Sequence, residues 1–251
     1  CGRWSTSSAI KTTKPGCFMT NRARSSHIGS CLSMADILAV LYGRIMNVDP
    51  ARPDWAERDR LIVSKGHAAA IVYAALAERG FIDRADLAGF CGDGSRLAGH
   101  VTRSVAGVEL STGSLGHGLP VAVGMALAAK RDDAAWRSIC IVSDGELDEG
   151  SNWEAIQVAQ HFRLDRLVCV VDYNKIQSFG SVAEVSDLHP LAAKFSAFNW
   201  GVREIDGHDH AALECCFAET PFHSGKPSVI VAHTVKGKGV SFMEGELLYH
   251  Y

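Results

Sequence analysis

The stretch ICIVSDG at residues 139–145 decides the fold of this chain. A run of apolar residues that stops at a polar turn is typical of a strand buried on both faces of a parallel sheet. The next residues, ELDEGSNWEA, lead into a segment with Trp153 and Ile156 at helical spacing. A second apolar run, at residues 167–171, ends in the same way at DYNKI, residues 172–176. The pattern predicts strands that alternate with helices.

Polar side chains stand where both of these strands should end. Asp144 offers a carboxylate oxygen and Asn174 an amide oxygen at the carboxyl edge of a parallel sheet, where ligands collect. Mg²⁺ and Ca²⁺ prefer oxygen ligands, and Mg²⁺ completes its octahedron with water and phosphate oxygens. The same residue types also fill ordinary turns, so these two positions alone leave a metal site and a pair of turns equally open. Gly92-Asp93-Gly94 resembles Ser143-Asp144-Gly145 in its letters, but no apolar strand precedes it, so we interpret it as a decoy.

Length and composition bound the class of protein. With 251 residues and 47% hydrophobic content, the chain fits one large α/β domain over residues 25–251, after a poorly defined N-terminal extension at 1–24. A net charge of −3 with interspersed signs gives no support for a nucleic-acid partner. No run approaches a membrane span, and the first residues lack the apolar core of a signal peptide. Eight cysteines without a CxxC pair predict reduced thiols and a cytoplasmic location, and the adjacent Cys215 and Cys216 are expected to pack in a helix.

Further elements can be predicted along the chain. Ser33 and Asp36 have the spacing of a capping box before a buried helix, and residues 60–63 and 228–232 form strand-like runs. Alanine-rich or glycine-rich helices are expected up to Arg79 and over 115–130. We expect Pro15-Gly16 to interrupt any long opening helix. These alternating elements predict a mostly parallel sheet with helices on both faces.

Three histidines fall in loops that should meet at the same sheet edge, in SSHIGS, SKGH and LAGH: His27, His67 and His100. Each has a glycine close by, which allows the backbone to approach a ligand. A single loop histidine is more often a bystander than a ligand. Three of them in this setting favour a functional site.

Seven motifs, taken together in their order along the chain, carry a family resemblance. The ordered motifs are SSHIGSCLS, DRLIVSKGHA, GSRLAGH, STGSLGHGLPVAVGMALA, SDGELDEGSNWEA, DYNKIQ and FNWGVREIDGHD. Over roughly residues 25–245 the chain resembles the N-terminal, diphosphate-binding domain of transketolase, and above all the N-terminal subunits of transketolases made of two polypeptides. The resemblance implies the thiamin diphosphate-binding fold, and transfer of a two-carbon ketol unit from a ketose or its phosphate to an aldose or its phosphate.

The resemblance also implies a cofactor site. Asp144, Asn174 and the backbone carbonyl of Ile176 match the family's ligands for the metal that holds thiamin diphosphate, normally Mg²⁺, with Ca²⁺ or Mn²⁺ as possible substitutes. The N–H of Gly145 and the side chain of His67 match groups that contact the diphosphate.

Further family positions concern the substrate and the subunit interface. His27 and His100 match catalytic histidines that bind sugar hydroxyls and move protons. The loop near the thiazolium and pyrimidine rings corresponds to Gly113, Ser114 and Leu115. Glu149 and Glu154 match acidic residues at the interface between paired sites, and Glu149 is also counted among the cofactor-binding positions. By themselves the two residues indicate only an acidic first turn of a helix.

Several positions depart from the family pattern. Ser143 replaces the first glycine of Gly-Asp-Gly, Tyr173 replaces a frequent asparagine, and His117 replaces a frequent glutamine. We expect His117 to pack at a helix start rather than to touch the cofactor. The family's late substrate-binding histidine has only His250 as a weak match.

No residue matches the glutamate that activates the cofactor from the pyrimidine-binding domain. We therefore expect a separate partner polypeptide that carries this domain and a C-terminal domain, in an α2β2 assembly. Two alternatives remain open: another thiamin-dependent enzyme, such as a 1-deoxyxylulose-5-phosphate synthase-like protein or the decarboxylating subunit of a 2-oxoacid dehydrogenase, and a non-catalytic regulatory subunit that retains the fold.

Overall fold

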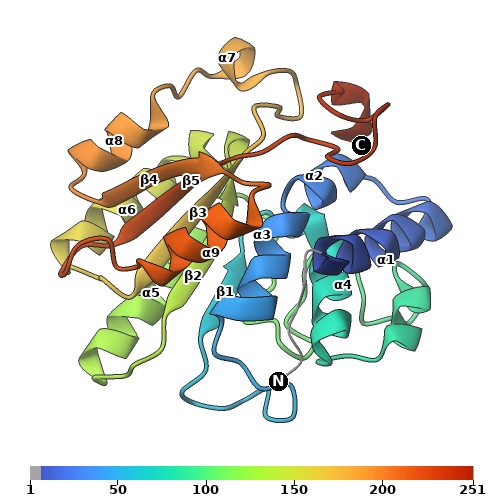
Figure 1. Cartoon of the computed structure of the whole chain (residues 1–251), viewed down its shortest axis with the longest axis horizontal. Helices are drawn as coiled ribbons and strands as arrows, with labels where there is room; N and C mark the ends of the chain where they lie inside the picture. The colour runs from blue at the N-terminus through green and yellow to red at the C-terminus, as the bar shows by residue number, and fades with distance from the viewer. Residues whose placement is uncertain (1–6, 251) are drawn as a thin grey trace.

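A parallel sheet forms the centre of the protein. The computed structural model describes residues 7–250, with side chains from residue 13 onward, and within that range the sheet order is β1-β2-β3-β5-β4 (Figure 1). The strands are β1 Arg60–Val63, β2 Ser138–Ser143, β3 Leu167–Tyr173, β4 Gly201–Asp206 and β5 Ser228–His233. All neighbouring strands pair in parallel, so their carboxyl ends lie at one edge. The predicted α/β class is confirmed.

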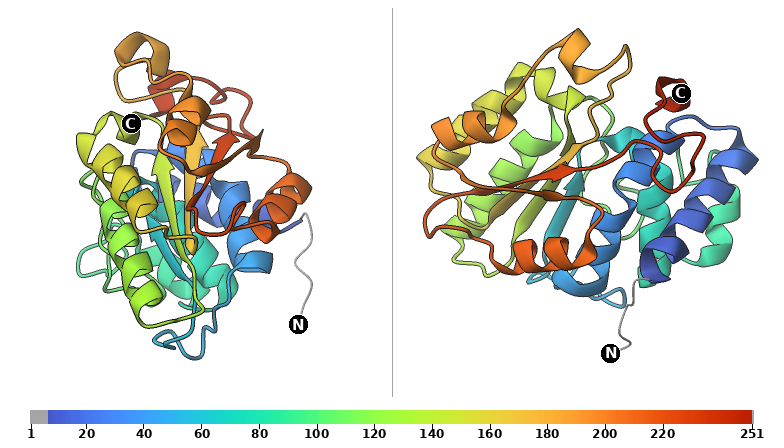
Figure 2. Two further views of the ribbon diagram at one scale, coloured as in Figure 1. Left: turned by 90° about the vertical axis from the view of Figure 1, so that its left-hand side faces the viewer. Right: turned by 45° about the horizontal axis from the view of Figure 1, so that its top comes forward.

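Alternating side chains of the strands build two cores. On one face Ile139 and Ile141 pack with α3 (Ala35–Val40), α4 (Ala69–Arg79) and α9 (His210–Ala218). On the other face Cys140 and Val142 pack with α5 (Gly118–Arg131) and α6 (Gly150–His161). The side view in Figure 2 shows helices on both sides of the sheet. The continuous apolar runs of β2 and β3 are explained by this burial on both faces.

The remaining helices and helical turns complete the described part of the chain. They are α1 Ser7–Ala23, α2 Ile28–Ser33, η1 Leu41–Ile45, η2 Gly66–Ala68, η3 Arg84–Gly89, η4 Gly145–Asp148, α7 Val182–Val185, α8 Leu191–Ala197 and η5 Leu247–His250. The C-terminal turn η5 lies beside α2 (Figure 1). Among the described residues, no helix is both long enough and apolar enough to cross a membrane.

Two local predictions were wrong. Pro15 does not interrupt the opening helix: α1 runs through this residue. α1 also packs along α4, and the contact is close, since a Cβ on Gly16 would lie 3.4 Å from Cδ1 of Ile71. Ser33 does not cap α3. It is the last residue of α2, and its hydroxyl donates instead to the Asp172 carboxylate at 2.6 Å, with the Ser30 carbonyl also 3.0 Å away. In both places tertiary packing outweighs the local signal.

Other differences concern strand β4, helix α5 and the cysteines. β4 was not predicted, because its side chains are mostly exposed or half-buried and include Arg203 and Glu204. The helix expected from 115 begins at Gly118. Cys216 is buried in α9 as expected, but Cys215 is exposed. Cys1 lies outside the described residues.

Asp36 joins α3 to the start of α9 through two histidines. Its carboxylate accepts from Nδ1 of His208 at 2.8 Å and from Nε2 of His210 at 2.7 Å. Nε2 of His208 accepts the Val235 N–H, which places the proton on Nδ1. Burial alone would raise the pKa of Asp36, but the two histidine hydrogen bonds outweigh it and lower that pKa below 3.8.

We expect Asp36→Asn to lower the free energy of unfolding at neutral pH and to reduce its dependence on acid. A carboxylate with a lowered folded-state pKa stabilises above its unfolded pKa, and this contribution disappears as the pH falls through the folded-state value. Urea unfolding at a series of pH values between about 3 and 7 measures this. Asp54→Asn, at an exposed aspartate, is the control. Parallel pH curves for Asp36→Asn and the wild-type protein would contradict the prediction.

Candidate active site

Asp144 follows β2 directly and is buried, with 2% of its surface exposed. Its carboxylate accepts hydrogen bonds from the backbone N–H groups of Gly145, at 2.8 Å, and Lys175. Burial and the nearby charge of Asp172 raise its pKa to about 6. No lysine, arginine or histidine within the described part of the chain forms an ion pair with it. A buried carboxylate with no cationic partner fits a bound metal ion.

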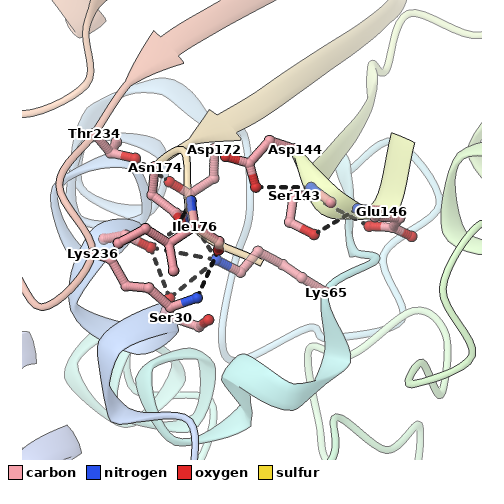
Figure 3. A network of polar contacts seen from close by, with 12 residues as sticks. Ser30, Lys65, Ser143, Asp144, Glu146, Asp172, Asn174, Ile176, Thr234 and Lys236 are labelled. Atoms are coloured by element: carbon pink, nitrogen blue, oxygen red, sulfur yellow. Dashed lines mark hydrogen bonds and ion pairs between the residues drawn. The ribbon is translucent and has the colours of Figure 1, made fainter. Parts of the chain in front are cut away.

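The other predicted metal ligands lie just beyond β3. Asn174 is buried, and its Oδ1 accepts the N–H of Ile176 at 3.2 Å. The carbonyl of Ile176 accepts from Nζ of Lys236 at 2.8 Å (Figure 3). The strand register explains the proximity to Asp144, because Ser143 of β2 pairs with Asp172 of β3. The sheet therefore brings the predicted clamp together.

Two buried lysines at this edge were missed from the sequence. Lys65 follows β1 and forms a fully buried ion pair with Asp172. Lys236 is 1% exposed, and its ammonium contacts the Ile176 carbonyl and Nδ1 of His250 rather than a carboxylate of the described residues. Burial and the charge of Lys65 lower the pKa of Lys236 to about 8. A buried ammonium without a carboxylate partner fits an anionic ligand.

The three predicted histidines cluster, and a fourth joins them. The ring centroid of His27 lies 5.0 Å from that of His67, 6.3 Å from that of His100 and 5.7 Å from that of His250. Burial lowers the pKa of His27, which His100 lowers further. Burial and Lys65 lower the pKa of His67 strongly, and burial and Lys236 lower that of His250 to about 3. These three rings are therefore neutral near pH 7, and the positive charge resides on the lysines.

Glu146 connects the loop of residues 113–116, which is expected to lie near the cofactor rings, to the ends of the strands. Its fully buried carboxylate accepts the Ser64 hydroxyl, the Gly116 N–H at 2.9 Å and the Ser143 N–H at 3.3 Å. Burial raises its pKa. The loop approaches the histidines closely, because a Cβ on Gly113 would lie 2.8 Å from the ring of His100. Glu146 thus fixes the loop of residues 113–116 against β2.

These groups surround one cavity of about 310 Å³ at the carboxyl edge of the sheet. It is lined by His27, Ser30, His67, His100, Gly113, Leu115, Asp144, Gly145, Glu149, Asn174, Ile176, Lys236 and His250, among others. Three positions lie elsewhere: Ser114 and Glu154 are exposed, and His117 is exposed at the start of α5 rather than packed.

The decoy Asp93 lines a different and larger cavity of about 640 Å³ that contains no histidine. In the described chain no cluster of three or more histidine, cysteine or acidic side chains could hold a metal. The clamp differs from such a cluster because its proposed ligands are one carboxylate, one amide and one backbone carbonyl.

Comparison with known proteins identifies the fold and its ligand. Residues 16–250 match the family model described as "Transketolase, thiamine diphosphate binding domain". This chain belongs to that family. The buried Asp144 and Lys236, each without an ionic partner in the described chain, fit a metal and a diphosphate at the same edge of the sheet.

Several relatives are named as subunits of transketolases. The chain is 44% identical over 225 residues to a 6-deoxy-6-sulfo-D-fructose transketolase subunit of Clostridium sp. (strain MSTE9), covering 89% of this chain and 82% of the relative. It is 41% identical over 231 residues to an apulose-4-phosphate transketolase subunit of Phocaeicola vulgatus, covering 92% and 82%. The solved transketolase from Campylobacter jejuni superposes with a TM-score of 0.91 at 33% identity, covering 97% of this chain and 39% of that one.

We expect Lys236→Met to weaken the binding of inorganic diphosphate with Mg²⁺ by about tenfold or more, because it removes a charge-assisted hydrogen bond. The ligand-free protein should be at least as stable as the wild-type protein, since a buried ammonium without a carboxylate is replaced by an apolar side chain. Calorimetric titration and urea unfolding measure the two effects. Lys238→Met, at an exposed lysine two residues away, is the matched control. Unchanged diphosphate affinity in Lys236→Met would contradict the assignment.

Proposed function

We propose that this chain is the diphosphate-binding subunit of a two-polypeptide transketolase that transfers a two-carbon ketol unit between sugars. The observation that carries the proposal is the strand-edge cavity, where Asp144, Asn174 and Lys236 lie within reach of four histidines. When bound, thiamin diphosphate supplies the nucleophilic carbon and the electron sink for breaking and forming the carbon–carbon bond. The side chains of this chain bind, orient and move protons.

The metal and diphosphate would be held at the ends of β2, β3 and β5. Asp144, Asn174 and the Ile176 carbonyl supply oxygen ligands suited to Mg²⁺, with Ca²⁺ or Mn²⁺ as alternatives. Lys236 would neutralise the diphosphate. The Gly145 N–H and His67 would donate hydrogen bonds to it, as the family resemblance implies.

The sugar would be handled by His27 and His100. Both line the cavity beside Gly113 and Leu115, which would lie against the cofactor rings together with the neighbouring Ser114. The lowered pKa of His27 keeps this ring neutral near pH 7, so it can accept a hydroxyl proton and return it. The catalytic role of these histidines is proton transfer and binding of sugar hydroxyls.

A second polypeptide would cover the cavity. Three large apolar side chains are exposed on this side of the protein: Phe179 at 86%, Leu248 at 78% and Phe242 at 63%. Phe179 lines the cavity itself, so a partner seated there would bury apolar surface and close the site. We propose that the partner carries the pyrimidine-binding domain with its activating glutamate, in an α2β2 assembly. The exposed Glu149 and Glu154 would then couple paired sites across the interface.

The names of the relatives support a class of substrate. Their names specify a sulfonated ketose and a ketose phosphate, so we propose a ketose with an anionic end as donor. We also propose a cytoplasmic location, supported by the free cysteines among the described residues, of which Cys140 and Cys169 are fully buried.

The reaction is tested on the chain assembled with its partner. We expect the purified complex, with thiamin diphosphate and Mg²⁺, to have the mass of an α2β2 assembly and to transfer a two-carbon unit from a ketose phosphate to an aldose phosphate. Neither polypeptide should have more than trace activity by itself. Exclusive use of pyruvate would instead identify another thiamin-dependent enzyme, and failure to bind the cofactor would identify a non-catalytic subunit.

Asp144 and the decoy Asp93 form a matched pair for testing the metal clamp. Asp144→Ala should reduce Mg²⁺-dependent binding of thiamin diphosphate by about 100-fold or more, because a metal ligand is lost in a site where even supporting residues contribute roughly 10- to 100-fold. Asp93→Ala removes the aspartate of a Gly-Asp-Gly that follows no strand and should leave binding unchanged. Calorimetry on the assembled protein measures both. Equal affinities for the two variants would refute the clamp.

A further inference from the structure

A second cavity, of about 350 Å³, adjoins the histidine cluster. His27, His67 and His100 line both cavities, so the two meet at these rings. The first cavity, which we propose holds the cofactor, lies against the strand ends. The second cavity lies instead against the loop after α1, at residues 24–26, and against Cys91. Neither residues 24–26 nor Cys91 line the first cavity.

Arg24 brings an unpaired positive charge to the second cavity. It follows the last residue of α1 with a left-handed backbone, at φ 49°. Its N–H donates to the Asn21 carbonyl and the next N–H, of Ser25, donates to the Thr20 carbonyl, as in a Schellman helix end. Glycine or asparagine is favoured at this position, so the backbone conformation does not select an arginine, while the charge of its side chain suits both the C-terminal end of α1 and an anion in the cavity. Among the described residues no carboxylate lies within ion-pair distance of Arg24.

The rest of the lining also suits an anion. The hydroxyl oxygen of Ser25 is buried and has no hydrogen-bond partner among the described residues. A buried hydroxyl without a partner is costly, and a ligand oxygen would satisfy it. None of the residues lining this cavity is acidic. A cation, a hydroxyl donor and imidazole N–H groups together match the oxygens of a tetrahedral anion.

We infer that this cavity is a specificity subsite that binds the anionic end, phosphate or sulfonate, of a sugar substrate, with Arg24 as the charged contact and Ser25 as a hydrogen-bond donor. The inference rests on the proposed function, because the carbonyl end of the sugar must lie at His27 and His100, which line both cavities. Since Lys236 lies in the other cavity, the diphosphate of the cofactor and the anion of the substrate have separate cationic partners.

Steady-state kinetics of the assembled protein test the subsite. Arg24→Gly should raise the KM for a phosphorylated ketose by about 10- to 100-fold, the expected loss of a charge-assisted contact, while an unphosphorylated ketose is unaffected. Glycine suits the left-handed backbone, so this variant should be at least as stable as the wild-type protein. Arg22→Ala, which removes a neighbouring exposed charge that does not line the cavity, is the control. An unchanged KM for the phosphorylated ketose in Arg24→Gly would overturn the inference.

Thiol labelling tests the subsite without any turnover. Cys91 is exposed and lines the same cavity, so inorganic phosphate or methanesulfonate should slow its alkylation in the full chain. The protection should be lost in Arg24→Gly and weakened in Ser25→Ala, but retained in Arg22→Ala. Stronger protection by one probe identifies which anion the subsite prefers. Protection by neither probe, or equal protection in Arg24→Gly, overturns the inference even if ketol transfer is observed. If ketol transfer fails while protection is seen, only the proposed reaction is lost.

Discussion

The buried ion pair between Lys65 and Asp172 is the interaction on which the site depends. Lys65 follows β1, Asp172 lies in β3, and both side chains are completely buried. Burial alone would raise the pKa of Asp172, but Lys65 and the hydroxyls of Ser33 and Thr234 outweigh this effect and lower it. Lys65 also donates to the Ser30 carbonyl, so one cluster holds β1, β3, α2 and the segment after β5 together. Loss of one partner would leave an uncompensated charge in the core.

That pair also influences the pKa values of its neighbours. Burial and then Asp172 raise the pKa of Asp144, and burial and then Lys65 lower the pKa of Lys236. Asp172 and Lys65 neutralise each other, whereas Asp144 and Lys236 have no ionic partner in the described chain. A divalent metal beside Asp144 and a diphosphate beside Lys236 would supply the missing charges. The fold therefore leaves at one edge a carboxylate and an ammonium that a metal–diphosphate pair can satisfy together.

The sequence predicted what is local and missed what depends on distant contacts. β2 and β3 were predictable from continuous apolar runs, and Asp144 and Asn174 from their place just after those runs. The same strand-end rule points to Lys65 after β1 and to Lys236 shortly after β5, but a single lysine in a sequence is typical of a solvated surface. The burial of Lys65 depends on Asp172, which lies 107 residues away along the chain. Glu146 was missed for the same reason, since its partners come from three separate segments.

Backbone strain distinguishes the site from ordinary helix ends. Left-handed residues other than glycine cost roughly 1–2 kcal/mol each. Four of these residues follow the ends of α1, α5, α6 and α8, where such a conformation terminates a helix: Arg24, Asp133, Arg163 and Asn199. Cys91 is the third residue of a β-turn in which the Gly92 N–H donates to the Gly89 carbonyl, another position that calls for a left-handed backbone. His27 and Lys175 have no such reason, yet His27 lines both cavities and the Lys175 N–H donates to Asp144. Because the surrounding packing must hold these two residues in place, their conformation is the local cost of directing a ring and an N–H into the site.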